Sequence, residues 1–158
     1  MKKYDIVETS KMAMEYDGSL IDVEKTAKTD LENGRVAVVK GKEVEYAAKG
    51  EKGEVFLINS VERMADTTKG LTEFINLAGE KVRITRFRNG DIFKTTAFTG
   101  TVAEGDYVLV DANGTFKKGT PTDEKIKFVV NSINCKLGFS SVSFGFDGIP
   151  AIELKIEM

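Results

Sequence analysis

Short apolar runs separated by glycine-containing turns dominate the chain from about residue 32 onward. Residues 35–39 and 43–47 flank Gly41, and glycine at that position supplies the positive φ that a tight hairpin needs. Residues 55–58 are apolar on both faces, which predicts a strand in the centre of a sheet. This part of the chain is therefore expected to begin as β structure.

The same pattern continues to the end of the sequence. Further strands are expected in residues 81–87, 91–98, 107–111, 115–119, 125–133 and 151–158. Asn89-Gly90 and Asn113-Gly114 are typical of tight hairpin turns. The two prolines, Pro121 and Pro150, fall in expected connections. Strands at this spacing predict a mainly β fold, either a small curved-sheet barrel or a sandwich.

One stretch has a helical period instead. Leu71, Phe74, Ile75 and Ala78 follow an i, i+3, i+4, i+7 pattern that ends at Gly79. The pattern predicts one short amphipathic helix, although a segment of this length also fits an ordered loop.

The N-terminal residues lack a sustained period. Residues 1–30 are polar with scattered apolar positions, and the alternation of Met12, Met14 and Tyr16 permits a short strand. We interpret them as an extended N-terminal arm on a single β domain of residues 31–158. Such an arm can cross its own domain or reach a neighbour's, and both alternatives stay open.

Composition supports one globular domain. A chain of 158 residues can bury about 70% of its unfolded surface, so it needs no disulfide or metal to fold. Hydrophobic residues make up 41% and charged residues 30%, which is typical of globular proteins. The net charge of −2 leaves no positive excess to neutralise phosphates, which argues against a nucleic-acid binder.

Two missing residue types restrict the chemistry. The chain has no histidine, the most common general base and a frequent zinc ligand. Its single cysteine, Cys135, cannot form an intramolecular disulfide or a cysteine cluster, and we interpret it as a small buried side chain. No apolar run suggests a signal peptide or a membrane span. We expect no cofactor, no membrane partner, and synthesis in a reducing cytoplasm.

Two Gly-Asp pairs raise the question of a catalytic or metal-binding site. Asp91 and Asp106 each follow a glycine and open an expected strand. Aspartate at a turn can bond nearby backbone N–H groups, and this role needs no ligand. A catalytic carboxylate needs a partner in an enclosed site, which the sequence does not indicate. We favour turn residues over a small enzyme or ligand-binding module that would use these aspartates and the arginines.

Other candidate sites also have structural interpretations. Asp111 and Asn113 have calcium-loop spacing but lack the further ligands, so a hairpin is expected. Arg83, Arg86 and Arg88 differ in parity, so one strand face cannot present all three to a nucleic acid. A solvated face or a salt-bridged subunit contact is expected there.

A glycine- and serine-rich segment near the C-terminus carries Phe139, Phe144 and Phe146. These rings are expected to fill the core of a curved sheet. If they are partly exposed, they form a flat apolar patch suited to a protein partner.

The order of these features resembles the head decoration, or cement, proteins of tailed phages. The matching features are the strand at 55–58, a polar stretch, "LTEFINLAGE", "GDIF", "GDYV" before a glycine hairpin, and a closing β segment. The resemblance covers roughly residues 32–158. A phage tail or baseplate component is the nearest alternative.

The resemblance implies a non-enzymatic virion structural protein, made in the bacterial host cytoplasm. It would bind the outside of the expanded capsid at junctions between major capsid protein subunits, and it could also associate with itself, for example as a trimer. Contact residues are expected in the arm and in the loop after residue 70: Tyr4, Ile6, Met12, Met14, Tyr16, Phe74 and Leu77.

Overall fold

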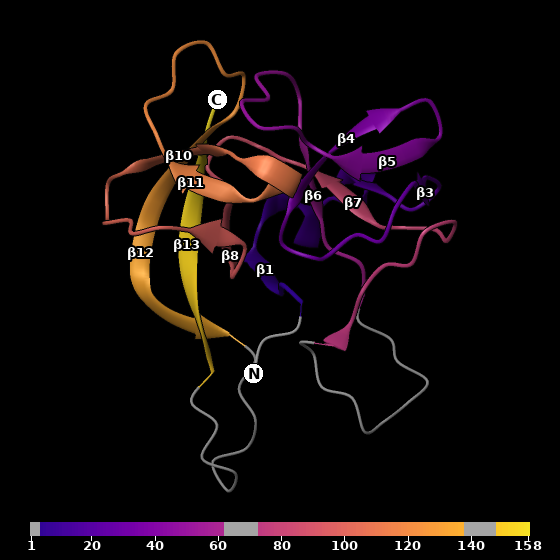
Figure 1. Ribbon diagram of the computed structural model, residues 1–158, viewed down its shortest axis with the longest axis horizontal. Helices are drawn as coiled ribbons and strands as arrows, with labels where there is room; N and C mark the ends of the chain where they lie inside the picture. Colours follow the sequence, from indigo (N-terminus) through magenta and orange to yellow (C-terminus); the bar gives the residue numbers. More distant parts are fainter. Residues whose placement is uncertain (1–3, 62–72, 138–147) are drawn as a thin grey trace, which may run out of the picture.

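The protein folds into two mixed β-sheets that pack against each other (Figure 1). The computed structural model describes residues 4–61, 73–137 and 148–158. Over these residues the fold is mainly β, as predicted, and its longest helical elements are turns of three residues. Neither sheet closes into a barrel among the described strands, so the sandwich with curved sheets is the better description.

The first sheet has seven strands, in the order β1 (Val7–Lys11), β8 (Ile92–Thr95), β13 (Ile149–Glu157), β12 (Lys127–Leu137), β10 (Tyr107–Val110), β11 (Phe116–Lys118) and β9 (Phe98–Thr99). The second sheet has six, in the order β2 (Ile21–Asp22), β7 (Ile84–Arg86), β6 (Phe56–Ile58), β4 (Val36–Lys40), β5 (Glu43–Tyr46) and β3 (Thr26–Ala27). The remaining elements among the described residues are three short 3₁₀ turns: η1 (Ala13–Glu15), η2 (Gly18–Leu20) and η4 (Ala112–Gly114).

Two apolar cores lie on opposite faces of the second sheet. Alternate residues of β4 and β6 point to opposite faces of the second sheet. Leu57 therefore enters the core between the two sheets, whereas Ile58 enters a second core on the other face of the second sheet, called the outer core below. The core between the sheets is built around four phenylalanines with ring centroids 4.9–6.4 Å apart: Phe87, Phe93, Phe116 and Phe128. The second sheet therefore carries an apolar core on each of its faces.

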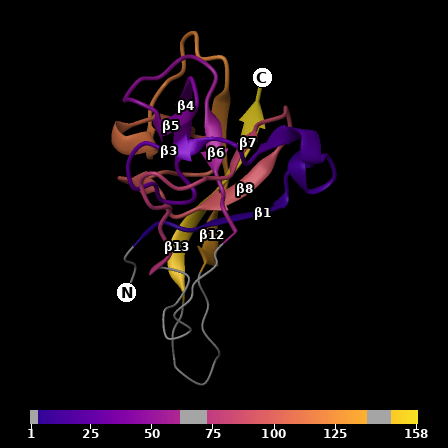
Figure 2. The ribbon, with the colours of Figure 1, turned by 90° about the vertical axis from the view of Figure 1, so that its right-hand side faces the viewer.

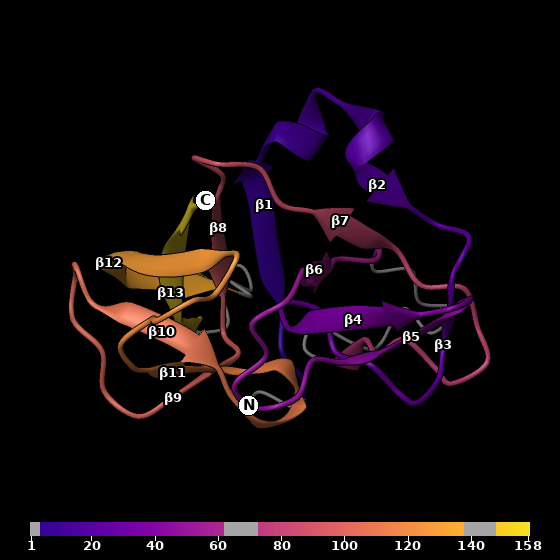
Figure 3. The same cartoon turned by 90° about the horizontal axis from the view of Figure 1, so that it is seen from above.

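The second sheet curls around its outer core (Figure 3). Strand β3, at one edge, meets the residues that lead into β7: Thr26 bridges Lys81, and the Ala27 N–H donates to the Glu80 carbonyl over 2.9 Å. The chain from β2 to β3 thus lies beside β7 and beside the residues that precede β7. This curl gives the outer core an open end beside β2.

The N-terminal segment crosses its own domain, one of the two alternatives that the sequence left open. Strand β1 pairs with β8 at the edge of the first sheet, and β2 and β3 occupy the two edges of the second. The short strand that the alternation of Met12, Met14 and Tyr16 permitted does not form. Strand β1 ends at Lys11, and the next residues form η1, which turns Met14 into the core.

Some of the expected turns differ from the structure. Asn89-Gly90 was predicted to close a hairpin, but it joins β7 of one sheet to β8 of the other. Gly90 has φ +88° whereas Asn89 does not take a positive φ, so the turn lacks the conformation of a two-residue hairpin. Asn113-Gly114 does close the β10–β11 hairpin, as predicted.

Two further expectations need correction, and some of the residues named in the sequence analysis lie outside the described residues. From Phe74 to Gly79 the chain is an ordered loop, bridged from Asn76 to Leu31, and not a helix; Leu71 lies outside the described residues. Pro150 lies at the second residue of β13 and not in a connection, near the strand start where proline is tolerated. Phe139, Phe144 and Phe146 also lie outside the described residues.

Strands β12 and β13 form a ribbon that runs beyond the rest of the first sheet (Figures 1 and 2). Strand β10 pairs with β12 only at residues 128–129, and β8 pairs with β13 only at residues 152–155. Register shifts between Val130 and Ser132, and between Ser132 and Cys135, bend β12. The end of the ribbon that holds Leu137 and Ile149 therefore extends beyond the neighbouring strands and consists of β12 and β13 alone.

Candidate functional site

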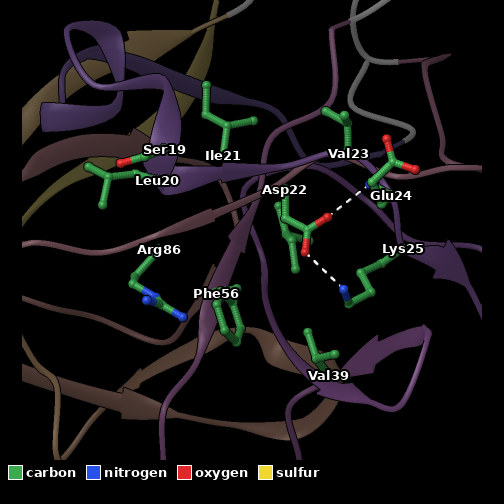
Figure 4. Close-up of a pocket in the computed structure, with 11 residues that line it drawn as sticks. Ser19, Leu20, Ile21, Asp22, Val23, Glu24, Lys25, Val39, Phe56 and Arg86 are labelled. Carbon is green, nitrogen blue, oxygen red and sulfur yellow. Dashed lines mark hydrogen bonds and ion pairs between the residues drawn. The ribbon is translucent and has the colours of Figure 1, made fainter.

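A groove of about 570 Å³ lies at the open end of the curled sheet. The segment from Ser19 to Lys25 forms one side of the groove, and Val39, Phe56 and Arg86 form the other (Figure 4). Ile84 also lines the groove. The mouth of a curled or closed sheet is a common position for binding sites. The groove is therefore the leading candidate site among the described residues.

The floor of the groove is apolar because it continues the outer core. Ile84 is fully buried, while Val39 and Phe56 pack against the same core and stay half-buried. The guanidinium of Arg86 lies 5.9 Å from the centroid of the Phe56 ring and bonds Glu54 over 3.1 Å. An incoming side chain would thus meet an aromatic ring and a cation together.

The carboxylate of Asp22 is held inside the rim of the groove. It accepts a hydrogen bond from the Glu24 N–H over 2.8 Å and pairs with the Lys25 ammonium at 3.1 Å. The backbone hydrogen bond, helped by the lysine, lowers the pKa of Asp22. The Lys81 ammonium donates to the Glu24 carbonyl over 2.7 Å, which also holds the backbone of the rim in place. These contacts favour binding over proton transfer, because the carboxylate is already stabilised as an anion.

Asp91 and Asp106 lie outside the groove and make two matching turns. Each carboxylate accepts a hydrogen bond from the N–H three residues earlier, Arg88 at 2.7 Å and Ala103 at 2.8 Å. Each aspartate N–H donates back to the carbonyl of that same residue over 3.1 Å. The repeated Gly-Asp pattern is therefore one turn motif used twice, as the turn interpretation predicted.

The two aspartates differ in what else they contact. Asp91 is 4% exposed, and its second oxygen accepts the Ala13 N–H over 2.8 Å, which anchors η1. Asp106 instead pairs with Lys118 at 3.0 Å. The Ala103 hydrogen bond and then this lysine lower the pKa of Asp106. The described residues contain no group of three or more acidic or cysteine side chains placed to hold a metal ion.

Replacing Asp91 with alanine is expected to destabilise the fold by about 2–3 kcal/mol, because a buried carboxylate is lost and two partly buried N–H groups lose their acceptor. The same change at Asp106 is expected to cost clearly less, since its turn hydrogen bond is exposed to water. Urea denaturation of both variants measures the difference. Equal losses would show that the η1 contact of Asp91 contributes nothing to stability.

The three arginines do not form a shared basic face. Arg83 donates to the Asn59 carbonyl over 2.8 Å, Arg86 bonds Glu54, and Arg88 pairs with Asp17 at 3.2 Å. Each has its own acceptor within the chain, and only Arg86 lines the groove. Where a solvated face or a salt-bridged subunit contact was expected, the three arginines make three separate contacts within the chain, and two of these contacts are ion pairs.

The expected partner-contact residues fall into three groups by exposure. Ile6, Met12 and Met14 are at most 4% exposed and fill the protein's own interior, so they cannot face a partner in this conformation. Tyr4 and Phe74 are half-buried. Tyr16 is 90% exposed and Leu77 is 48% exposed, so these two remain available.

Sequence reasoning missed the groove and several exposed apolar residues, among them Val23, Val61 and Ile133. The run at 55–58 was predicted to be a central strand, and β6 does lie inside the second sheet, but its pattern does not indicate that Phe56 reaches the groove. Cys135 is half-buried; its thiol donates to the Ala151 carbonyl over 3.1 Å, and burial raises its pKa. That shift disfavours the reactive thiolate.

Among the described residues no helix is long and apolar enough to cross a membrane. No family model matches the chain, and neither a curated protein nor a solved structure matches it.

Proposed function

We propose that the chain is a non-enzymatic structural protein that decorates the outer surface of a tailed-phage capsid and bridges neighbouring major capsid protein subunits. The observation that carries the proposal is the separation of its exposed apolar side chains. Tyr16 follows η1, Leu77 lies in the loop before β7, and Ile133 lies on the projecting ribbon. In Figure 2 the η1–η2 segment and the far end of the ribbon lie on different sides of the body.

Bridging needs two contact surfaces on one rigid body. The body has two apolar cores, and its described buried side-chain nitrogen and oxygen atoms all have hydrogen-bond partners. Exposed tyrosine and large aliphatic side chains supply contact area at such surfaces. Each contact with a capsid subunit can be weak and the protein still stays bound to the capsid, because each copy is held at more than one point.

The non-enzymatic part of the proposal is supported by how the carboxylates are used. Asp91 and Asp106, the two candidate catalytic residues, and Asp22 of the groove each accept a hydrogen bond from a backbone N–H group in a turn. The resemblance to decoration proteins, carried by the order of motifs, supplies the specific assembly.

Binding to purified, expanded capsids that lack this protein tests the proposal. The intact chain is expected to sediment with the capsids, and the double substitution Leu77→Glu with Ile133→Glu is expected to weaken binding at least about tenfold, by placing charges at apolar contacts. Lys42→Glu, at the exposed β4–β5 turn, is the control and should bind like the intact chain. If the intact chain does not sediment with capsids, the proposal fails.

The groove favours a second candidate function, a small-molecule binding module. Its apolar floor and charged rim would suit a compact ligand with an apolar body. Asp91 and Asp106 would have no part in such a site, since neither lines the groove.

A further inference from the structure

Among the described residues, four charged side chains line the groove, and each is paired with an opposite charge of the same chain. The pairs are Asp22 with Lys25 at 3.1 Å, Glu24 with Lys81 at 3.9 Å, and Arg86 with Glu54 at 3.1 Å. The described part of the groove therefore offers a ligand no unpaired charge. A ligand with a net charge would lose water on entering without gaining a counter-charge. The pairing thus selects against charged ligands.

A purely apolar ligand is disfavoured for a different reason. Asp22 and Lys25 are half-buried beside the floor, with 38% and 27% of their side chains exposed. An alkyl chain lying on Val39 and Phe56 would remove the remaining water from this pair and replace none of the lost hydrogen bonds. The paired groups keep bonding capacity, because each cation has N–H donors left over and a carboxylate oxygen accepts more than one hydrogen bond. The ligand that fits is neutral, with hydroxyl groups around an apolar body.

We propose that the groove binds a neutral sugar ring. One face of such a ring consists of C–H groups that pack on apolar and aromatic side chains, and its edge carries hydroxyl groups that both donate and accept. In the view of Figure 4, the Phe56 ring lies between Arg86 on one side and the Asp22 carboxylate on the other. A sugar ring packed on Phe56 would therefore have polar partners at both of its edges.

The polar partners are already in position before a ligand arrives. The Asp22 carboxylate is held by the Glu24 N–H over 2.8 Å and by the Lys25 ammonium. Groups that are fixed in advance lose little freedom on binding. The volume of about 570 Å³ lies within the range of about 300–1,000 Å³ that is typical of small-molecule sites. This ligand class refines the small-molecule function proposed for the groove, on which the inference rests, and does not depend on the capsid role.

Heteronuclear NMR titrations of the purified full chain with glucose, galactose and N-acetylglucosamine test the inference. At least one of these sugars is expected to shift the backbone amide signals of residues 19–25, Phe56 and Arg86, with a Kd on the order of 1 mM, since a single ring is a small ligand. The amino sugar and the uronic acid of the best ligand, measured at slightly acidic pH where they are a cation and an anion, are expected to bind at least about fivefold more weakly.

Two substitutions in the Asp22–Lys25 pair give the sharper result, because each removes one charge and leaves the other unpaired. Asp22→Asn, which keeps an acceptor for the Glu24 N–H, is expected to change the preference toward the uronic acid. Lys25→Met is expected to change it toward the amino sugar, each by about fivefold or more. A loss of folding cannot produce opposite preferences. Tyr107→Ala is the matched control, because Tyr107 is exposed on β10, away from the groove, and should bind all these sugars like the intact chain.

Unchanged groove signals with all three neutral sugars, or charged forms that bind the intact chain as tightly as the neutral one, would overturn the inference. If phenol shifts the same signals where the sugars do not, the inference fails and the small-molecule function of the groove stands. If glucose binds, tighter binding of maltose would identify a chain of rings as the ligand, and equal binding would identify a single ring. Capsid binding is measured separately and is not affected by either result.

Discussion

Replacing Gly114 with alanine is expected to destabilise the fold by more than about 3 kcal/mol. Gly114 closes the β10–β11 hairpin at φ +67°, and a Cβ built there would lie 2.1 Å from the Val36 carbonyl oxygen. That oxygen belongs to β4, at the centre of the second sheet, and cannot rotate away as a side chain could. The hairpin would have to leave β4 and open the core between the sheets.

The control is Gly41→Ala in the β4–β5 turn. Gly41 has a similar φ of +63°, but nothing lies within 4 Å of a Cβ built there. Its replacement is expected to cost only about 1–2 kcal/mol, the backbone penalty alone. Urea denaturation monitored by circular dichroism gives both values. Equal losses at the two glycines would contradict the close approach of the hairpin to β4.

Replacing Arg35 with alanine is expected to cost about 3–5 kcal/mol, the range for breaking a buried ionic group by removing one partner. The Arg35 guanidinium bonds Asp5 at 2.8 Å and Glu32 at 2.5 Å, with 17% of its side chain exposed. It also lies over the Tyr46 ring, 5.2 Å from the centroid. Its removal would leave two acidic side chains facing each other beside the N-terminal strand.

Limited proteolysis and urea denaturation together measure this effect. The substitution is expected to release the residues before β1 for cleavage, since Asp5 attaches them to β4 through Arg35. Arg88→Ala removes an exposed pair and is expected to cost at most about 1 kcal/mol. Arg35→Ala with intact stability and unchanged cleavage would show that the network does not hold the N-terminal segment.

The strands could be predicted from the sequence because local patterns determine them. Apolar alternation and glycine turns indicated nearly every strand from Val36 onward, and Asn113-Gly114 indicated a real hairpin. The assignment of strands to sheets could not be predicted in this way. Asn89-Gly90 has the composition of a hairpin turn, but the strands on its two sides pair with distant partners in different sheets.

The N-terminal segment was harder to predict for the same reason. Ile6, Met12 and Met14 are isolated apolar residues in a polar stretch, and their burial depends on β8 and on the Asp91 turn, which lie about eighty residues away. The groove depends on the curl that joins Thr26 to Lys81. Long-range pairings of this kind leave no periodic signal in the sequence.

The copy number of this chain in purified virions tests the central proposal most directly. Virions from the source that encodes the chain would be banded on a density gradient, and the chain would be quantified against the major capsid protein. The proposed role predicts one copy per capsid subunit or a simple fraction of it. Tens of copies or fewer would indicate a tail or baseplate component, and absence from the virion would contradict the structural role altogether.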